Sequence, residues 1–300
     1  MKKRYIVTLC LFVLFLAAGG LFFGKRASFE DKCAESYGKD YARIAVYHRD
    51  PVSFDTVNAY RVGIDARLIS DSHSAEGRLW YDAFASFGEA SVSRIDSLTP
   101  FRAKTLSVSA DFFKLHSFKL LSGDVFYGDD NYSDRVLIDE RCSFELFGSY
   151  DSVGMPLEIN SKTWYVAGVF KAEDSDAWRG QFEDYPTLIL PCDIESGELY
   201  SVYEIVLPSP VGSYGLDVVK GVATDEAVVD VTNRYGFSHL FDNLSDFFTR
   251  SYVTQPVSYP WFENTARGRV DVLSLFLLLW CVSGAALVIS LSYLYIRRKK

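Results

Sequence analysis

The stretch VLSLFLLLWCVSGAALVISLSYLYI, from Val272 to Ile296, decides the character of the chain because it holds no charged side chain over 25 residues. A second such stretch, YIVTLCLFVLFLAAGGLFF, covers 19 residues from Tyr5 to Phe23. A helix needs about 20 apolar residues to cross a hydrocarbon core of ~30 Å. The sequence therefore predicts two transmembrane helices, over residues 5–24 and 271–296.

The first stretch has an alternative interpretation as a secretory signal peptide. Residues 2–4 form a basic region, and Ala17-Ala-Gly offers the small side chains at which such a leader is cleaved. The apolar run continues to Phe23, however, and is longer than the ~7–15 residues typical of a leader. A retained helix is the preferred interpretation.

Basic residues beside the two stretches predict their orientation, because Lys and Arg gather on the cytoplasmic side of membrane helices. Residues 1–4 carry three basic side chains against two at 25–26, and the four at 297–300 outnumber the two at 267–269. Both tails, 1–4 and 297–300, are then cytoplasmic. Residues 27–266 lie outside a bacterial plasma membrane.

The segment between the stretches has the composition of a folded, acidic domain. The chain is 49% hydrophobic and 23% charged, as globular proteins are. Residues 27–266 hold 38 of the 39 acidic and 20 of the 31 basic residues, a net charge of −18. Such a surface repels phosphates, so nucleic acid is excluded as a partner.

Hydrophobic periodicity along this segment predicts an α+β domain. A βαβ half at each end is the pattern of a split βαβ sheet, formed by residues 27–110 and 195–266, while short strands in residues 111–194 predict an inserted β-rich subdomain. The expected strands are 42–48, 80–94, 105–109, 135–139, 157–160, 164–170, 187–190, 200–207 and 227–232. The expected helices are 53–70, 111–117, 140–147 and 213–220.

An apolar stripe at helical spacing follows the second half. A stripe that faces the core is preferred, and a membrane-surface or partner-binding face is the alternative. Its members are Phe237, Leu240, Phe241, Leu244, Phe247 and Phe248.

Several short motifs succeed one another within the middle of the domain. They are Val108-Ser-Ala-Asp-Phe-Phe113, Leu120-Leu-Ser-Gly-Asp124, Arg135-Val-Leu-Ile-Asp-Glu140, Leu146-Phe-Gly148, Val153-Gly-Met155, Leu157-Glu-Ile-Asn160 and Val166-Ala-Gly-Val169. In this order and spacing they resemble the periplasmic core domain of MacB-like (FtsX-related) ABC transporter permeases. The family has three membrane spans after this domain where this chain has one, so the chain is more similar to the short two-span variants.

The resemblance implies a porter-like subdomain with a small β-rich insertion. It also implies a non-catalytic membrane subunit whose partners are a separate ABC ATPase, a further permease subunit and membrane lipid. The motif residues are interpreted as specifying fold rather than chemistry, with the glycines at sharp turns or close backbone contacts. These residues are Phe112, Phe113, Gly123, Leu146, Phe147, Gly148, Gly154, Gly168 and Val169.

No catalytic, cofactor-binding or metal-binding residue is predicted. Residues 19–25 match Gly-x-x-x-x-Gly-Lys, but Arg26 replaces the Ser or Thr that holds magnesium, and the match lies in an apolar stretch. The acidic residues of 124–134, and those of 173–184 around Trp178, are expected in solvated turns; partner contact is the alternative for the second group. Four isolated histidines, expected to be solvated or capping, lack the spacing of zinc ligands: His48, His73, His116 and His239.

Three of the five cysteines, Cys33, Cys142 and Cys192, lie in the exterior segment. An odd number allows at most one internal disulfide. Buried free thiols, which behave as small apolar side chains, are the preferred interpretation.

Two functions from different classes are preferred, and an exterior enzyme is a third alternative. In the first, the domain couples ATP-driven helix motion to an extracytoplasmic substrate or effector. In the second, the chain is a membrane-tethered binding or scaffolding module without transport activity.

Overall fold

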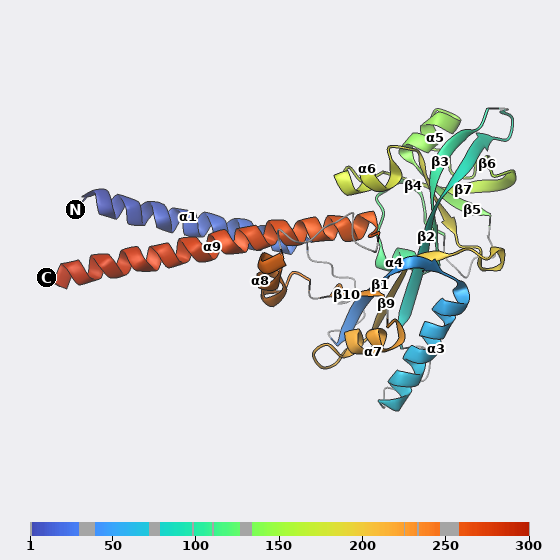
Figure 1. Cartoon of the computed structure of the whole chain (residues 1–300). Coiled ribbons are helices and arrows are strands. Elements are labelled where there is room, and N and C mark those ends of the chain that lie inside the picture. The colour runs from blue at the N-terminus through green and yellow to red at the C-terminus, as the bar shows by residue number, and fades with distance from the viewer. Residues whose placement is uncertain are drawn as a thin grey trace. The chain divides into compact units, whose positions relative to one another are not determined.

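Two units make up the chain (Figure 1). The computed structural model describes residues 2–29, 40–71, 79–97, 99–109, 111–126, 134–224, 226–232, 234–246 and 258–299. The helix unit comprises Met1–Asp31, Asn233–Tyr252 and Glu263–Lys300, and the sheet unit comprises Lys32–Thr232 and Val253–Phe262.

The described elements alternate between strands and mostly short helices. The strands are β1 (Tyr41–Val52), β2 (Tyr81–Arg94), β3 (Phe101–Val108), β4 (Leu120–Gly123), β5 (Arg135–Asp139), β6 (Pro156–Ile159), β7 (Lys162–Phe170), β8 (Thr187–Pro191), β9 (Tyr200–Pro208) and β10 (Ala227–Asp230). The helices are α1 (Lys2–Phe29), α3 (Phe54–Ser70), α4 (Phe112–Leu115), α5 (Glu140–Phe147), α6 (Asp176–Phe182), the 3₁₀ turn η1 (Ile194–Ser196), α7 (Tyr214–Val222), α8 (Phe237–Asp246) and α9 (Trp261–Lys299).

The two ends of the domain interlock as a split βαβ sheet, as the sequence predicts. The strand order β10-β1-β9-β2 places β9 between β1 and β2, and β1 between β9 and β10. Every neighbouring pair in this part is antiparallel, so each βαβ half contributes two parallel strands separated by a strand of the other half. Neither half can complete its hydrogen bonds alone.

Strand β1 is buried on both faces because each face lies on a separate core. Its even positions Ala42, Ile44 and Val46 pack beneath α3 and α7, together with Val57 and Val219 of those helices. Its odd positions Ala45 and Tyr47 belong to the opposite core, which includes Trp178 and Trp261. The alternation of side chains along a strand explains this division.

The sheet continues from β3 through β8, β5 and β7 to β4, while β6 pairs with β2 and β7. A third core lies in this part, where Leu146 of α5 packs with Val136, Leu157 and Val169. The strands β3 and β8 run parallel, in the register Leu106 to Ile189. Because one sheet passes through both proposed subdomains, a boundary at 110/111 and 194/195 stays a prediction.

The sequence analysis missed strand β4, helix α6 and the start of α9. The segment around Trp178, expected as a solvated turn, contains helix α6; its carboxylates at 173, 174 and 176 are exposed as expected, but the Trp178 ring is buried. Helix α9 begins at Trp261, ten residues before the predicted span.

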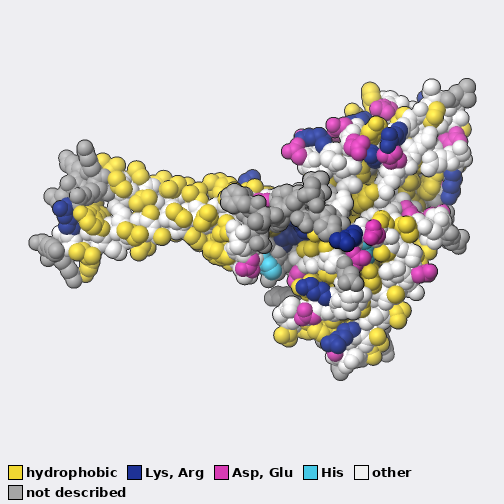
Figure 2. Space-filling model, in the orientation of Figure 1, with side chains coloured by type: hydrophobic (Ala, Val, Ile, Leu, Met, Phe, Trp, Pro, Cys, Tyr) yellow, Lys and Arg dark blue, Asp and Glu magenta, His cyan; other side chains and the backbone are white. Residues whose placement is uncertain are grey.

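The helix unit contains α1, α8 and all but the first two residues of α9. Both α1 and α9 are long and apolar enough to cross a membrane. Figure 2 shows hydrophobic side chains along the surface of this helix pair, while acidic and basic side chains are frequent on the sheet unit. An apolar surface of this length is typical of helices that contact lipid.

The motif glycines lie at tight backbone positions. Gly123 of β4 and Gly168 of β7 are opposite each other, and a Cβ added to Gly123 would lie 2.2 Å from the carbonyl oxygen of Ala167. Gly123 also has a positive φ of 72°. Gly148 ends α5 in the left-handed conformation, and its N–H donates to the Phe144 carbonyl at 2.8 Å.

We expect Gly123→Ala to lower the free energy of unfolding by at least ~2 kcal/mol, because a Cβ is strained at positive φ and collides with backbone that cannot move alone. The measurement is urea unfolding of the full chain in micelles, followed by tryptophan fluorescence. Gly180→Ala is the matched control: Gly180 lies in α6, where a Cβ would meet no atom within 4 Å, so alanine there leaves stability unchanged or raises it by about 0.5–1 kcal/mol. Equal effects at the two positions would contradict the assignment.

Candidate functional site

The start of α9 lies inside the hydrophobic core of the sheet unit. The ring of Trp261 is 5.0 Å from that of Trp178, 5.4 Å from that of Phe182 and 6.2 Å from that of Phe87, between centroids. With Phe118, these residues form what we call the Trp261 cluster. Trp261 is 4% exposed, so the helix begins as part of the core.

A buried charge cluster, Arg43, His116 and Glu204, lies beside this aromatic core. Nη2 of Arg43 is 3.1 Å from Oε1 of Glu204, and Nε2 of His116 contacts Oε2 of the same carboxylate. The His116 ring is 4.3 Å from the ring of Phe262 and stacks on Phe112 at 4.4 Å. The second residue of α9 therefore contacts a side chain that is bound to the buried carboxylate.

The electrostatics of Glu204 depend on its two partners. Burial would raise the pKa of this carboxyl, but the charge of Arg43 and the interactions with His116 outweigh burial and hold the pKa at about 2. Because this pKa lies below the ordinary value of 4.5, the ionised carboxylate stabilises the fold above about pH 4.5. The contribution is lost as the pH falls toward 2.

The expectation that the histidines are solvated or capping is wrong for two of them. His116 joins the buried charge cluster. His48 is 3% exposed, with Nδ1 3.1 Å from Oε1 of Glu226, and burial lowers its pKa although Glu226 opposes the change. His239 is exposed, and His73 lies outside the described residues. The sequence around His48 and His116 could not predict these contacts, because their partners Glu226 and Glu204 lie far away in the chain.

The motif residues divide between two regions. Phe112 is buried beside His116, and Phe113 packs edge to face on Phe112 at 6.0 Å, so both belong to the core that holds Trp261. Leu146, Phe147 and Val169 lie in the third core, with Phe147 only partly buried. Gly154 has a positive φ of 79°, and its N–H donates to the Val166 carbonyl at 2.8 Å. We propose that these residues specify the fold.

Asp139, within the motif at 135–140, links three elements. Its carboxylate caps α5 by accepting from the Cys142 N–H at 2.6 Å and accepts from the Thr187 N–H of β8 at 3.0 Å. Burial raises the pKa of this carboxyl to about 6, although both hydrogen bonds oppose the change. The sequence analysis did not single out this residue, although an acidic side chain directly before a helix signals a cap.

The described cysteines of the sheet unit are free thiols. Cys142 is fully buried, and burial raises its pKa well above the ordinary value; burial also raises the pKa of Cys192 to about 12. Such thiols are inert at neutral pH. Cys33 lies outside the described residues. Within the described ranges, no group of three or more His, Cys, Asp or Glu side chains could hold a metal ion.

In the helix unit, α1 and α9 pack along their apolar lengths through small residues. A Cβ added to Gly19 would lie 2.8 Å from Nε1 of Trp280, and one added to Gly284 would lie 3.0 Å from Phe15. The Phe15 ring also stacks on Trp280 at 5.7 Å. Small residues allow helix backbones to approach closely in lipid, where apolar burial drives no association.

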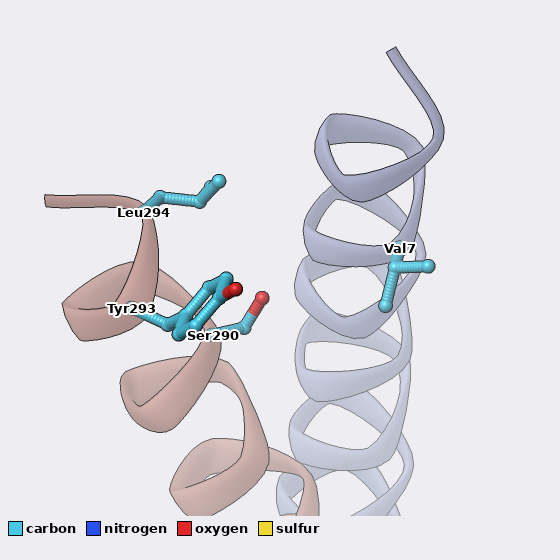
Figure 3. A pocket seen from close by; sticks show the side chains of 4 residues that line it. All are labelled: Val7, Ser290, Tyr293 and Leu294. Carbon is cyan, nitrogen blue, oxygen red and sulfur yellow. The ribbon is translucent and has the colours of Figure 1, made fainter. Parts of the chain in front are cut away.

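A polar contact joins the other ends of these helices. Oγ1 of Thr8 is 2.7 Å from Oγ of Ser290. Beside it lies a small pocket, lined by Val7 of α1 and by Ser290, Tyr293 and Leu294 of α9 (Figure 3). Its four lining residues carry the hydroxyl groups of Ser290 and Tyr293 and no charged group.

The first turns of α9 within the helix unit carry a second buried carboxylate. Glu263 is 2% exposed, accepts from Arg234 at 2.5 Å and forms an ion pair with Arg267 at 2.7 Å. Two cations around one carboxylate offset the cost of burying its charge. No sequence motif marked these residues.

Comparison with solved structures finds similar structures at low sequence identity. The periplasmic region of MacB from Actinobacillus actinomycetemcomitans is 12% identical, with a TM-score of 0.45, over 74% of this chain and 99% of that one. MacB is the family that the motifs resemble. The extracellular domain of the noncanonical ABC-type transporter YknZ from Gram-positive bacteria is 12% identical, with a TM-score of 0.41, over 64% and 99% of the two chains.

A domain of a putative permease protein from Porphyromonas gingivalis is 17% identical, with a TM-score of 0.37, over 59% of this chain and 79% of that one. No family model and no curated protein matches the sequence.

We expect Glu204→Leu to cost about 3–5 kcal/mol of stability at neutral pH, because Arg43 stays buried without its carboxylate. The double variant Arg43→Met/Glu204→Leu recovers most of this loss, since apolar side chains replace a buried pair at little net cost. In urea unfolding between pH 4.5 and 2, the variants without Glu204 lose less stability than the unsubstituted chain does.

The control for this cycle is Asp96→Asn, which breaks the exposed pair with Arg94 and should leave the free energy of unfolding nearly unchanged, because solvent screens this pair. An equally small effect at Glu204, or an unchanged acid profile without it, would refute the role of the charge cluster.

The helix packing predicts that Gly19→Ile separates the helices while Gly20→Ile does not, since no atom lies within 4 Å of a Cβ added at Gly20. The reporter is a disulfide between Thr8→Cys and Ser290→Cys in a chain without native cysteines. Linked peptides, quantified by mass spectrometry of oxidised membranes, should fall several-fold with isoleucine at 19 and stay constant with isoleucine at 20. Equal yields would show that the packing is wrong.

Proposed function

We propose that the chain is a membrane subunit of a MacB-like ABC transport or mechanotransmission complex. The sheet unit is its extracytoplasmic domain, and α1 and α9 anchor that domain in a bacterial plasma membrane with both termini in the cytoplasm. The chain itself is non-catalytic and binds no cofactor. ATP is hydrolysed by a separate ABC ATPase subunit, and a further permease subunit completes the assembly.

The observation that carries this proposal is the continuity of α9. The helix runs unbroken from Trp261 to Lys299, so its first two residues pack in the sheet unit while its apolar length is a candidate membrane span. In this proposal, movement of the span reaches the core around β1, β2 and β9 through Trp261 and Phe262. The ordered family motifs in residues 108–169 support the same function independently.

The buried charge cluster beside Trp261 supports a role of this region in conformational coupling. Phe262 contacts His116, which contacts Glu204 on β9, so a displacement of Phe262 reaches a strand that lies between β1 and β2 in the sheet. Coupling of this kind needs a second state that both parts favour or disfavour together. In the proposed complex, the nucleotide cycle of the ATPase subunit shifts the equilibrium between the two states.

The proposal predicts that the affinity-tagged full chain, purified from native membranes in mild detergent, brings an ATPase subunit with it. Hydrogen exchange in β1 and β9 should then change on addition of ATP. Trp261→Ala should abolish this change while the ATPase subunit remains bound, because the aromatic link is lost.

The matched control is Trp164→Ala, which removes a buried ring of the third core. It should preserve the nucleotide dependence. A lone chain without an ATPase partner, or exchange that is indifferent to nucleotide, would contradict coupling and favour a tethered binding or scaffolding module.

A further inference from the structure

Helix α8 presents an exposed apolar face next to the two candidate spans. Phe237 and Phe241 are one helical turn apart and lie on one face. They are 41% and 49% exposed, which is high for phenylalanine side chains in a folded unit. The core-facing stripe expected from the sequence is thus only partly correct for its described members, since Leu240 is fully buried while these two rings are not. Phe247 and Phe248 lie outside the described residues.

The other face of α8 is fixed to α9 by polar contacts. Nδ2 of Asn243 donates to Oδ1 of Asp271 and to Oγ of Ser274, both at 3.1 Å. Asp271 directly precedes the uncharged stretch 272–296. Because Asn243 and Leu240 are buried there, α8 is held at the level where α9 changes from polar to apolar.

Contacts with helix α1 independently place α8 at the end of the apolar stretch. The Phe237 ring is 5.6 Å from the ring of Phe22, and the guanidinium of Arg26 lies 5.2 Å from the Phe237 centroid. Phe22 and Phe23 end the first apolar stretch, and Lys25 and Arg26 follow it. The exposed rings of α8 therefore lie where both spans leave the hydrocarbon.

We propose that α8 is an interfacial helix, whose Phe237 and Phe241 enter the boundary between headgroups and acyl chains of the extracytoplasmic leaflet. This inference rests on the proposal that α1 and α9 span a membrane. Aromatic side chains concentrate at this depth, and amphipathic helices lie in this plane with their apolar face buried. Phe237 packs on Phe22 at the end of the apolar stretch of α1, so the exposed rings adjoin a candidate span, which identifies lipid as their occupant.

The charge of α8 defines the kind of lipid contact. The segment FSHLFDNLSD contains Asp242 and Asp246 and no Lys or Arg. Attraction to anionic headgroups therefore contributes nothing, and burial of the two rings drives the contact. Around the helix, Ser238 lies about 100° from Phe237 and about 60° from Phe241, while Asp242 lies about 140° and 100° from them. Both polar side chains are exposed.

The test places a nitroxide label on the full chain, without native cysteines, in phosphatidylcholine liposomes. Labels are attached singly at Phe241→Cys, at Ser238→Cys as the polar-face control, and at Val288→Cys on the exposed side of α9 within the span. Electron paramagnetic resonance then compares collisions with oxygen, which concentrates in lipid, and with a water-soluble nickel chelate. We expect the ratio of oxygen to nickel accessibility at 241 to exceed that at 238 several-fold.

Two results would overturn the inference. Equal ratios at 241 and 238 would show the rings in water, and low access to both reagents at 241 would show that protein covers them. The label at 288 separates this failure from that of the proposed function. Oxygen access at 288 with nickel access at 241 refutes the interfacial helix alone, whereas nickel access at 288 refutes the membrane span itself.

Discussion

The burial of Trp261 is the interaction on which the proposed coupling depends. The first turn of a helix lacks intrahelical partners for its N–H groups and frays readily unless tertiary contacts hold it. Here that turn is held by a ring packed among Trp178, Phe182 and Phe87. Truncation of a buried aromatic ring typically costs about 3–5 kcal/mol, which is enough to hold a helix end in one place.

Two buried carboxylates lie near the start of α9. Glu204 and Glu263 are almost completely buried carboxylates. Glu204 lies beside the Trp261 cluster and is bound by Arg43, and Glu263 lies in the first turn of α9 and is bound by Arg234. A buried pair adds little net stability, because the cost of desolvation offsets the attraction. Its geometry is nevertheless demanding, since a displaced partner leaves a charge in apolar surroundings. The packed aromatic rings stabilise the position of Trp261. A displacement of the first turn of α9 would be unfavourable because it would leave a buried charge unpaired.

The sequence predicted most strands and helices of the sheet unit, but it did not predict the start of α9 or the buried charge cluster. Strong local patterns identified most strands and helices, and uncharged stretches marked α1 and the span within α9. The start of α9 was missed because Trp261-Phe-Glu-Asn-Thr-Ala-Arg267 is polar enough to resemble a loop, and its helicity depends on tertiary contacts of Trp261 and Glu263. Helix α6 was missed because five carboxylates around Trp178 conceal one buried face. His116 and Glu204 are separated by 88 residues, so no local pattern could place them together.

The central claim is that the sheet unit lies outside the cytoplasm, anchored by α1 and α9. The most direct measurement uses Val211→Cys, at a side chain that is 77% exposed on the sheet unit, in a chain without native cysteines. Intact cells are treated with a membrane-impermeant maleimide, and Lys300→Cys is the control for the cytoplasmic side. The account predicts labelling at 211 in intact cells and labelling at 300 only after lysis. Labelling at 211 only after lysis, or release of the labelled chain from the membrane without α1, would contradict it.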